Sequence, residues 1–282
     1  MCNVAIARYA AVRLVEDPMH SVNAAKAPLL DAVIRRSGVQ GVGFHIHNDF
    51  PIAAGLGGSS AASVALLGAL SEWQDKPWER AAIAEEGRRI EVEDLGIAGG
   101  RQDYYAATHG GALALTFSDR VHVRRIPLAK MTREQLVARS VLVYTGQSRI
   151  SGDTITAVLS AYEQGERRVV HALQRMRQLA IDMAVALEAA DLDAIGDLLN
   201  EHWEHQRSLH PSIPTARIDE IIGTAVRAGA LGAKAMGASG GGCVLILARA
   251  DNADHIRRIV GPMGVIVDFD VDEEGLSVGR AA

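Results

Sequence analysis

The segment from Pro51 to Ala62 concentrates the residues most suited to holding a phosphate group. It is Pro51-Ile-Ala-Ala-Gly-Leu-Gly-Gly-Ser-Ser-Ala-Ala62, and it leads into an apolar stretch, residues 61–73, that predicts a buried helix. Glycines let the backbone turn so that several N–H groups point to one place, and the helix N-terminus adds partial positive charge. The segment lacks the Gly-Lys-Ser/Thr ending of a Walker A loop and the Gly-x-Ser-x-Gly pattern of a nucleophile elbow. We favour phosphate binding; the alternative is a turn that only permits close helix packing.

A second glycine-rich run, Gly237-Ala-Ser-Gly-Gly-Gly242, precedes the apolar segment 243–247, which predicts a strand. Glycine at this density beside a strand indicates that a ligand or another backbone approaches closely. Taken alone, the run is better explained as an ordinary flexible connection. Two such loops in one chain favour a shared nucleotide site.

Two carboxylates could supply the reactive groups. Glu91 lies late in a predicted helix that begins near Pro77, and Gly87 one turn earlier leaves room for a ligand or metal beside it. Asp103 follows a loop with several glycines and precedes Tyr104-Tyr105. One carboxylate could hold a cation while the other takes a proton. The alternatives are a solvated helix charge for Glu91 and a helix cap for Asp103, and the residues alone do not choose between them.

The histidines of the segment 200–207 could form a metal site, but their pattern supports one only weakly. His202 and His205 are one helical turn apart, but a transition-metal site needs imidazoles that converge from a fixed shell. We favour an amphipathic helix with Trp203 facing inward.

These residues need a mixed scaffold to position them. Strands are predicted at 4–15, 42–47, 112–117, 121–126, 140–145, 242–248 and 265–271, and helices at 28–36, 61–73, 77–94, 217–228 and 253–260, with an almost wholly helical stretch over 154–206. An α/β first half and a helix-then-strand second half predict two α+β domains. We place the domains at residues 1–138 and 139–282.

The composition argues against a nucleic-acid-binding protein, a disulfide-rich protein and a membrane-spanning protein. The 282 residues carry 29 Lys and Arg against 34 Asp and Glu, a net charge of −5, which argues against binding nucleic acid through its phosphates. The two cysteines cannot build a disulfide framework, so we expect a cytoplasmic enzyme. The uncharged run 50–71 is long enough to cross a bilayer, but its glycines, serines and proline indicate a buried loop and helix instead.

Taken together, these motifs resemble those of the GHMP kinases. The loop Gly55–Ala62 is similar to their phosphate-binding motif with Gly58 as a variation, and the run Lys234–Gly242 is similar to their C-terminal glycine motif with Ser239 in place of a more usual glycine. Within the superfamily the likeness is greatest to the D-glycero-D-manno-heptose 7-phosphate kinases. Four groups of residues show this likeness: 90–96 together with 100–104 and 110–111, then 144–149, 201–209 and 229–242. It spans nearly the whole chain.

The resemblance implies an α+β, two-domain GHMP kinase-like fold, with an N-terminal domain like ribosomal protein S5 domain 2 and a ferredoxin-like C-terminal domain. It implies ATP-dependent phosphorylation of a sugar phosphate at its anomeric hydroxyl, with ATP and Mg²⁺ as cofactors. Asp103 matches the catalytic carboxylate, and Glu91 with Ser59 or Ser60 matches the metal-binding positions. The nucleotide contacts implied are Gly55, Leu56, Gly57, Gly58, Ser59, Ser60, Ala61, Gly237, Gly240 and Gly241. Arg101, Arg149 and Arg207 are the candidates to bind the existing phosphate of the substrate, Arg149 first.

The chain departs from the family at its start. Relatives carry a Gly-Gly-Thr-Asp-like motif upstream of the segment that matches Asn3-Val-Ala-Ile-Ala, where this sequence begins. We expect the natural protein to be longer. The alternatives are another GHMP kinase of hexose or fucose type, an ATP-using decarboxylase on the same fold, and a truncated nucleotide-binding pseudoenzyme. The implied partners are small molecules, with neither nucleic acid nor membrane, and a homodimer is left open.

Overall fold

The computed structural model describes residues 1–16, 28–51, 53–147 and 151–279. The chain forms two compact units. The large unit contains residues 1–4, 53–56 and 112–271, and the small unit contains residues 5–52, 57–111 and 272–282. The chain passes from one unit to the other several times. The predicted boundary between residues 138 and 139 divides the sequence only once and stays a prediction.

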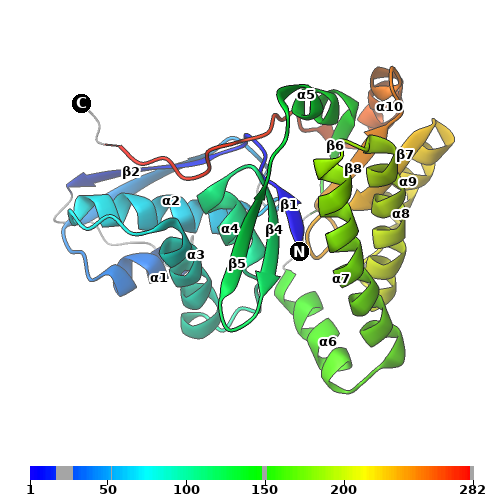
Figure 1. Ribbon diagram of the computed structural model, residues 1–282. Helices are drawn as coiled ribbons and strands as arrows, with labels where there is room; N and C mark the ends of the chain where they lie inside the picture. Colours follow the sequence, from blue (N-terminus) through cyan, green and yellow to red (C-terminus); the bar gives the residue numbers. More distant parts are fainter. Residues whose placement is uncertain (17–27, 52, 148–150, 280–282) are drawn as a thin grey trace. The chain divides into compact units, whose positions relative to one another are not determined.

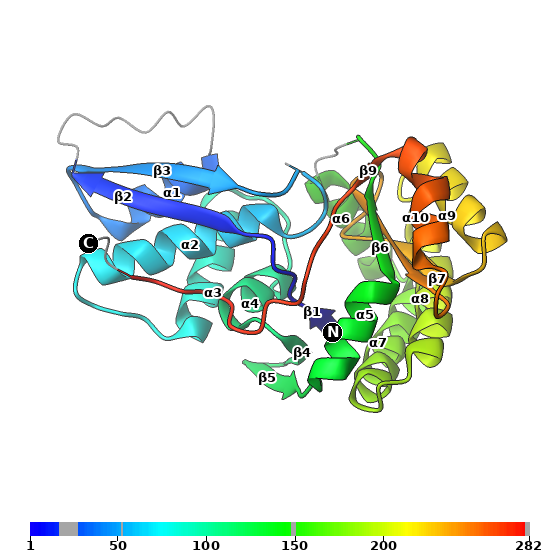
Figure 2. The same cartoon turned by 90° about the horizontal axis from the view of Figure 1, so that it is seen from above.

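The small unit combines one antiparallel strand pair with a group of helices. Its elements are β2 (Ala10–Glu16), α1 (Pro28–Ser37), β3 (Val42–Asn48), α2 (Gly58–Trp73), α3 (Arg80–Arg89), a π-helical turn (Ile90–Asp94) and α4 (Gln102–His109). Strands β2 and β3 pair from Ala10 opposite Asn48 to Glu16 opposite Val42, α2 packs on β2 (Figure 2), and α1 packs on α2. Helix α2 is buried by its neighbours: Leu66, Leu67 and Leu70 are at most 4% exposed. This burial explains its lack of charged residues between 58 and 71.

The large unit contains two antiparallel sheets and most of the long helices. Its elements are β1 (Cys2–Val4), β4 (Ala112–Phe117), β5 (Val121–Ile126), α5 (Lys130–Arg139), β6 (Ser140–Tyr144), α6 (Ser151–Glu163), α7 (Arg167–Glu188), α8 (Leu192–Leu209), α9 (Ala216–Arg227), β7 (Ala230–Ala235), β8 (Cys243–Ala248), α10 (Ala253–Val260), a 3₁₀ turn (Gly261–Met263) and β9 (Val265–Ile266). One sheet has the order β1-β4-β5, and the other has the order β7-β8-β6-β9. From β6 onward the chain order is strand, helices, strand, strand, helix, strand, which together with this sheet order is a ferredoxin-like arrangement.

Helices α7 and α8 lie side by side in the large unit, and α8 packs closely on β7 (Figure 1). Two glycines permit this approach, because a Cβ at Gly232 of β7 would collide with the carbonyl of Gly196 on α8. Asn200 on α8 then bonds the strand on both sides, donating to the Leu231 carbonyl at 2.8 Å and accepting from the Ala233 N–H at 3.1 Å. The C-terminal half of α8 is thereby fixed next to the chain that follows β7.

The observed elements confirm most of the predicted ones. The expected helices at 28–36, 61–73, 217–228 and 253–260 and the strands at 42–47, 112–117, 121–126, 140–145 and 242–248 are present to within a few residues, and the stretch 154–206 lies in three helices. The buried helix expected within residues 50–71 is confirmed as α2, but the loop before it is not buried: Ala53 and Gly55 are exposed, and Ala54 is the buried residue between them. In the described part of the chain, no helix is both long and apolar enough to cross a bilayer.

The helix expected over 77–94 is confirmed from Arg80 to Asp94, with its last five residues in a π-helical turn. Two predicted strands are wrong in part. The strand expected over 4–15 is interrupted, because β1 pairs with β4 of one unit and β2 pairs with β3 of the other. The strand expected over 265–271 pairs only at its first two residues, and Asp272 beyond it already donates to the Ala5 carbonyl.

Three elements were not predicted from the sequence: α4, α5 and β7. The glycines before α4 indicated a loop, and the alanine- and glycine-rich β7 has low strand propensity. Its pairing with β8 and its cover by α8 make it a strand.

Candidate functional site

The predicted phosphate loop ends in a sharp left-handed turn at the start of α2. Gly55 has a φ of +73° and Gly57, the N-cap of the helix, has a φ of +74°, conformations that favour glycine. The first hydrogen bond of the helix runs from the Ala61 N–H to the Gly57 carbonyl at 2.9 Å. The N–H groups of residues 58–60 precede that bond and have no partner within the helix. This is the arrangement that binds an anion.

Asp103 lies against the glycine that begins this helix. A Cβ added to Gly57 would lie 3.1 Å from both Cβ and Cγ of Asp103. Asp103 is in the first turn of α4, and its Oδ1 accepts a hydrogen bond from the Gln102 side chain at 3.1 Å. The alternative role as a helix cap is wrong, because Arg101 is the N-cap and no side chain caps this helix. The structure thus brings the predicted catalytic carboxylate to the predicted phosphate loop.

Glu91 lies in the π-helical turn that follows α3. The turn closes through a bond from the Leu95 N–H to the Ile90 carbonyl, and such turns often occur at functional sites. Oε2 of Glu91 accepts a hydrogen bond from the Tyr104 hydroxyl at 3.0 Å. Gly99 also approaches Oε2 so closely that a Cβ there would collide with it. The half-buried carboxylate is therefore held on one oxygen, and the alternative of a solvated helix charge is not what the structure shows.

The predicted purpose of Gly87 is wrong. The space beside this glycine is not left for a ligand, because a Cβ there would lie 2.6 Å from Cε1 of Tyr104. The fully buried ring of Tyr104 fills it. Burial raises the pKa of Tyr104, and the nearby Ser60 side chain opposes that rise. Ser60 is buried, whereas Ser59 is exposed at the helix N-terminus.

Burial and like charge dominate the electrostatics of this region. Burial raises the pKa of Asp103, opposed by the hydrogen bond from Gln102. Burial also raises the pKa of Glu91; the Tyr104 hydroxyl and the charge of Arg88 lower it, and the charge of Asp103 raises it further. The two carboxylates therefore disfavour each other's ionised form, which a cation near them would relieve.

The donor set fits Mg²⁺. Carboxylate and hydroxyl oxygens are ligands of the kind that Mg²⁺ takes, and Mg²⁺ commonly needs only one or two protein carboxylates with the rest supplied by phosphate and water. Glu91 forms no ion pair within the described part of the chain. The described residues contain no group of three His, Cys, Asp or Glu side chains able to hold a metal.

In the large unit, the second glycine-rich run approaches the first half of the phosphate loop. A Cβ at Gly237 would lie 3.1 Å from the Gly55 carbonyl oxygen, and the Cys243 N–H donates to the Ala54 carbonyl at 2.8 Å. The close approach predicted for this run is therefore that of another backbone. Gln206 on α8 also donates to the Gly237 carbonyl at 2.9 Å, and Ser239 donates to the Ile213 carbonyl at 2.8 Å. These two hydrogen bonds fix the run to α8 and to the loop that contains Ile213.

The predicted substrate arginines are less clearly placed. Arg101 donates from Nε to both oxygens of Glu85, each at 3.1 Å. Arg207 on α8 is paired with Glu204 and Asp219, so its charge is already balanced. Arg149 lies outside the described residues. Phosphate binding by any of the three stays a prediction.

The histidine helix is confirmed as an amphipathic helix. Trp203 on α8 is 2% exposed and belongs to the core of the large unit. Burial, with a smaller contribution from the charge of Lys234, lowers the pKa of His202 to about 3. Burial therefore keeps the ring of His202 neutral.

Sequence reasoning missed two side chains of this region, Tyr104 and Gln206. The signal for Tyr104 in the sequence is its position directly after Asp103. Gln206 had no signal, because its role depends on the packing of α8 against the glycine-rich run.

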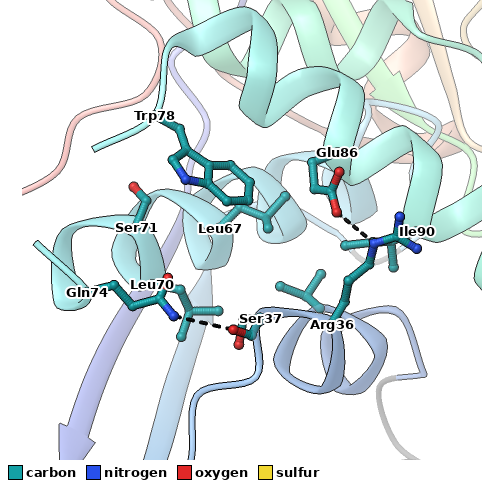
Figure 3. Close-up of a pocket in the computed structure, with 10 residues that line it drawn as sticks. Arg36, Ser37, Leu67, Leu70, Ser71, Gln74, Trp78, Glu86 and Ile90 are labelled. Carbon is teal, nitrogen blue, oxygen red and sulfur yellow. Dashed lines mark hydrogen bonds and ion pairs between the residues drawn. The ribbon is translucent and has the colours of Figure 1, made fainter. Parts of the chain in front are cut away.

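A separate small pocket of about 80 Å³, open to solvent, lies between α1, α2 and α3 in the small unit. Figure 3 shows Trp78 among the side chains that line it and Arg36 paired with Glu86. None of the predicted site residues lines this pocket.

The sequence matches two family models, described as "GHMP kinases N terminal domain" over residues 22–111 and "GHMP kinases C terminal" over residues 183–263. Among curated relatives, it is 30% identical to a D-glycero-alpha-D-manno-heptose 7-phosphate kinase of Campylobacter jejuni, over 84% of this chain and 70% of that protein. It is 28% identical to a mevalonate kinase of Pyrococcus abyssi, over 84% of this chain and 69% of that protein.

Solved structures agree at the level of the fold. A D-glycero-D-manno-heptose 1-phosphate kinase from Bacteroides thetaiotaomicron has a TM-score of 0.76 at 23% identity, over 99% of this chain and 90% of that one. A mevalonate kinase of L. major in complex with R-mevalonate has a TM-score of 0.72 at 20% identity, over 98% of this chain and 90% of that one. The chain belongs to the GHMP kinases: it is a phosphotransferase with the two-domain fold of that family.

Proposed function

We propose that the protein transfers the γ-phosphoryl group of ATP to a sugar phosphate, with D-glycero-D-manno-heptose 7-phosphate as substrate, its anomeric hydroxyl as acceptor and the 1,7-bisphosphate as product. The observation that carries the proposal is the contact of Asp103 with Gly57 at the N-terminus of α2. This contact joins a proton acceptor to an anion-binding helix end. The name of the Campylobacter relative supports the choice of sugar.

The nucleotide phosphates would be bound by backbone N–H groups of Gly57 to Ser60, with the partial positive charge of α2 behind them. Gly55, Leu56 and Ala61 shape the same loop. Gly237, Gly240 and Gly241 remain predicted further contacts with the nucleotide. Phosphoryl transfer asks the protein mainly to align the groups and to balance their charge, so this backbone cradle is suited to the task.

Asp103 would act as the general base. The oxygen of the sugar hydroxyl attacks the γ-phosphorus, the bond from that phosphorus to the bridging oxygen of the β-phosphate breaks, and ADP leaves with the bond electrons. The hydroxyl proton passes to a carboxylate oxygen of Asp103 and then to solvent. A base works best when its pKa is near the working pH, and burial raises the pKa of Asp103 in that direction.

Glu91, with Ser59 or Ser60, would hold Mg²⁺. Bound there, the ion neutralises charge on the β- and γ-phosphates. The structure supports Glu91 in this role because its Oε2 is fixed by Tyr104 and Gly99, so the orientation of the carboxylate does not have to be organised when the ion binds.

The test is ADP release measured over a panel of acceptors: the heptose 7-phosphate, the heptose 1-phosphate, galactose, fucose and mevalonate. Each is run with Mg²⁺, with excess EDTA, and with Asp103→Ala as the control variant. We expect turnover with the 7-phosphate that EDTA abolishes and that Asp103→Ala reduces by a factor of about 10² to 10⁴. Phosphorus NMR of the product should show a new anomeric phosphate.

Each other outcome rejects part of the proposal. Turnover with a hexose, fucose or mevalonate in place of the heptose phosphate would reassign the substrate. Undiminished turnover in Asp103→Ala would remove the base. Binding of Mg·ATP without turnover on any acceptor would indicate a pseudoenzyme, and calorimetry without any Mg·ATP binding would reject the kinase mechanism for this chain.

A further inference from the structure

Tyr104 connects the three groups to which the proposed function gives chemical roles. Its hydroxyl donates to Oε2 of Glu91 at 3.0 Å, and the nearby Ser60 side chain opposes the rise in the pKa of Tyr104 that burial causes. Asp103 precedes it directly on α4. One buried phenol therefore contacts the proposed metal-binding serine and glutamate, and its backbone continues into the proposed base.

The ring of Tyr104 has little freedom to move. It is fully buried, and it lies against the backbone of α3 at Gly87, where a Cβ would be 2.6 Å from Cε1 and 2.7 Å from Cδ1. Ser63 on α2 closes the same space: its hydroxyl is fully buried and has no hydrogen-bond partner in the described part of the chain. Two helices thus fix the position of the phenol.

The direction of the hydrogen bond determines which oxygen of Glu91 is left for an ion. A phenol is a hydrogen-bond donor toward a carboxylate, so Tyr104 occupies Oε2. Gly99 crowds the same oxygen and is farther from Oε1, with a hypothetical Cβ 3.6 Å away. Oε1 is the oxygen that neither neighbour occupies.

We propose that Tyr104 is a positioning residue for the metal: it fixes the rotamer of Glu91 so that Oε1 is the ligand of the Mg²⁺ that accompanies the nucleotide. The proposal rests on the proposed function, because it takes Glu91 as the metal ligand. Partners that orient a metal ligand in this way change metal affinity by a factor of about 10 to 100 when they are removed.

The chain contains a matched control next to Tyr104. The Tyr105 hydroxyl donates to Oε1 of Glu85 at 3.0 Å, and its ring is 2% exposed. The two tyrosines have the same chemistry, burial and helix, but Glu85 is paired with Arg101 rather than with a proposed metal site. Loss of either hydroxyl removes one bond between a tyrosine and a carboxylate.

The experiment compares Tyr104→Phe with Tyr105→Phe in the full chain. Binding of Mn²⁺ in the presence of ADP is measured by the electron paramagnetic resonance signal of the free ion, and the Mg²⁺ concentration for half-maximal turnover is measured at saturating ATP. We expect both values to rise about 10-fold or more in Tyr104→Phe and to change less than about two-fold in Tyr105→Phe. We expect similar losses of melting temperature in the two variants.

Equal metal affinity in the two variants overturns the proposal. If Tyr104→Phe fails to fold, Gly87→Ala is the second variant, because it keeps the hydroxyl but displaces the ring; unchanged Mn²⁺ binding there also overturns the proposal. Glu91→Gln separates the two levels of the argument. If Glu91→Gln leaves Mn²⁺ binding intact, the proposed metal role of Glu91 fails. If it weakens binding and Tyr104→Phe does not, only the role of Tyr104 fails.

Discussion

Two regions of this protein use opposite means to prepare a site. In the small unit, Glu91 and Asp103 are side chains in surroundings that disfavour their charge, and tyrosine and glutamine side chains hold them. In the large unit, the glycine-rich run 237–242 offers backbone, and its glycines admit other backbone at distances that exclude a Cβ. The properties of the first region therefore depend on protonation and ion binding, and those of the second depend on the close packing of its backbone.

The difference predicts how each region fails. A substitution among the carboxylates should leave the fold intact and remove activity, because electrostatics there favours neutral groups. A substitution in the glycine-rich run should disturb the fold first. Four experiments, taken from the largest expected effect to the smallest, test this distinction.

Asp103→Asn should lower kcat by a factor of about 10² to 10⁴, because the amide cannot accept the hydroxyl proton. The melting temperature should stay unchanged or rise, since burial disfavours the carboxylate of Asp103. ADP-release kinetics and thermal melts of the same preparation provide the measurement. A large loss of melting temperature would show that Asp103 supports the fold. That result would contradict the proposed difference between the two regions.

Gly241→Ala should destabilise the protein by about 1–3 kcal/mol, because its φ of +154° is a glycine conformation. A Cβ there would also lie 2.6 Å from the Gln147 carbonyl oxygen. Gly223→Ala is the control. Gly223 lies within α9, where a Cβ would meet only the end of the Arg227 side chain, so alanine should stabilise by roughly 0.5–1 kcal/mol. Urea unfolding measures both, and equal effects in the two variants would contradict the prediction.

Substitution of His202 tests whether protonation changes the stability of the large unit. Its pKa falls from 6.5 to about 3 on folding, so the unfolded chain binds more protons between these values and stability is lost as the pH falls through this range. At pH 5 the loss is about 2 kcal/mol relative to neutral pH. His202→Leu should remove that part of the pH dependence. Urea unfolding at pH 7 and pH 5 measures it, and parallel losses in wild type and variant would refute the assignment.

Ser239→Gly should have the smallest effect. Glycine relieves a φ of +66° but loses the hydrogen bond to the Ile213 carbonyl, and the two terms, each about 1 kcal/mol, nearly cancel. Ser239→Ala keeps the strained φ and loses the bond, so it should be about 1 kcal/mol less stable than wild type. Urea midpoints of the two variants provide the comparison, which fails if alanine is the more stable.

The same contrast explains what the sequence could predict. Local patterns were sufficient for helices such as α1 and α10 and for the hairpin β4–β5, because periodicity and turn residues act over a few positions. The glycines of the phosphate loop also carried their own signal. The neighbours of Glu91 did not, because Tyr104 reaches it through the packing of α4 on α3, and the π-helical turn leaves no mark in the sequence. The purpose of Gly87 was misjudged for the same reason: its partner is distant along the chain.

The contact between Phe50 and Gly58 bears on how this loop can diverge among relatives. A Cβ at Gly58 would collide with the Phe50 ring, so the glycine at this position is matched to its aromatic neighbour. Changing one position alone forces the ring to swing away. We therefore expect the two sites to covary, with serine at the glycine position accompanied by a smaller side chain at the other. An alignment in which large aromatics and serine co-occur freely there would show that the ring moves at little cost.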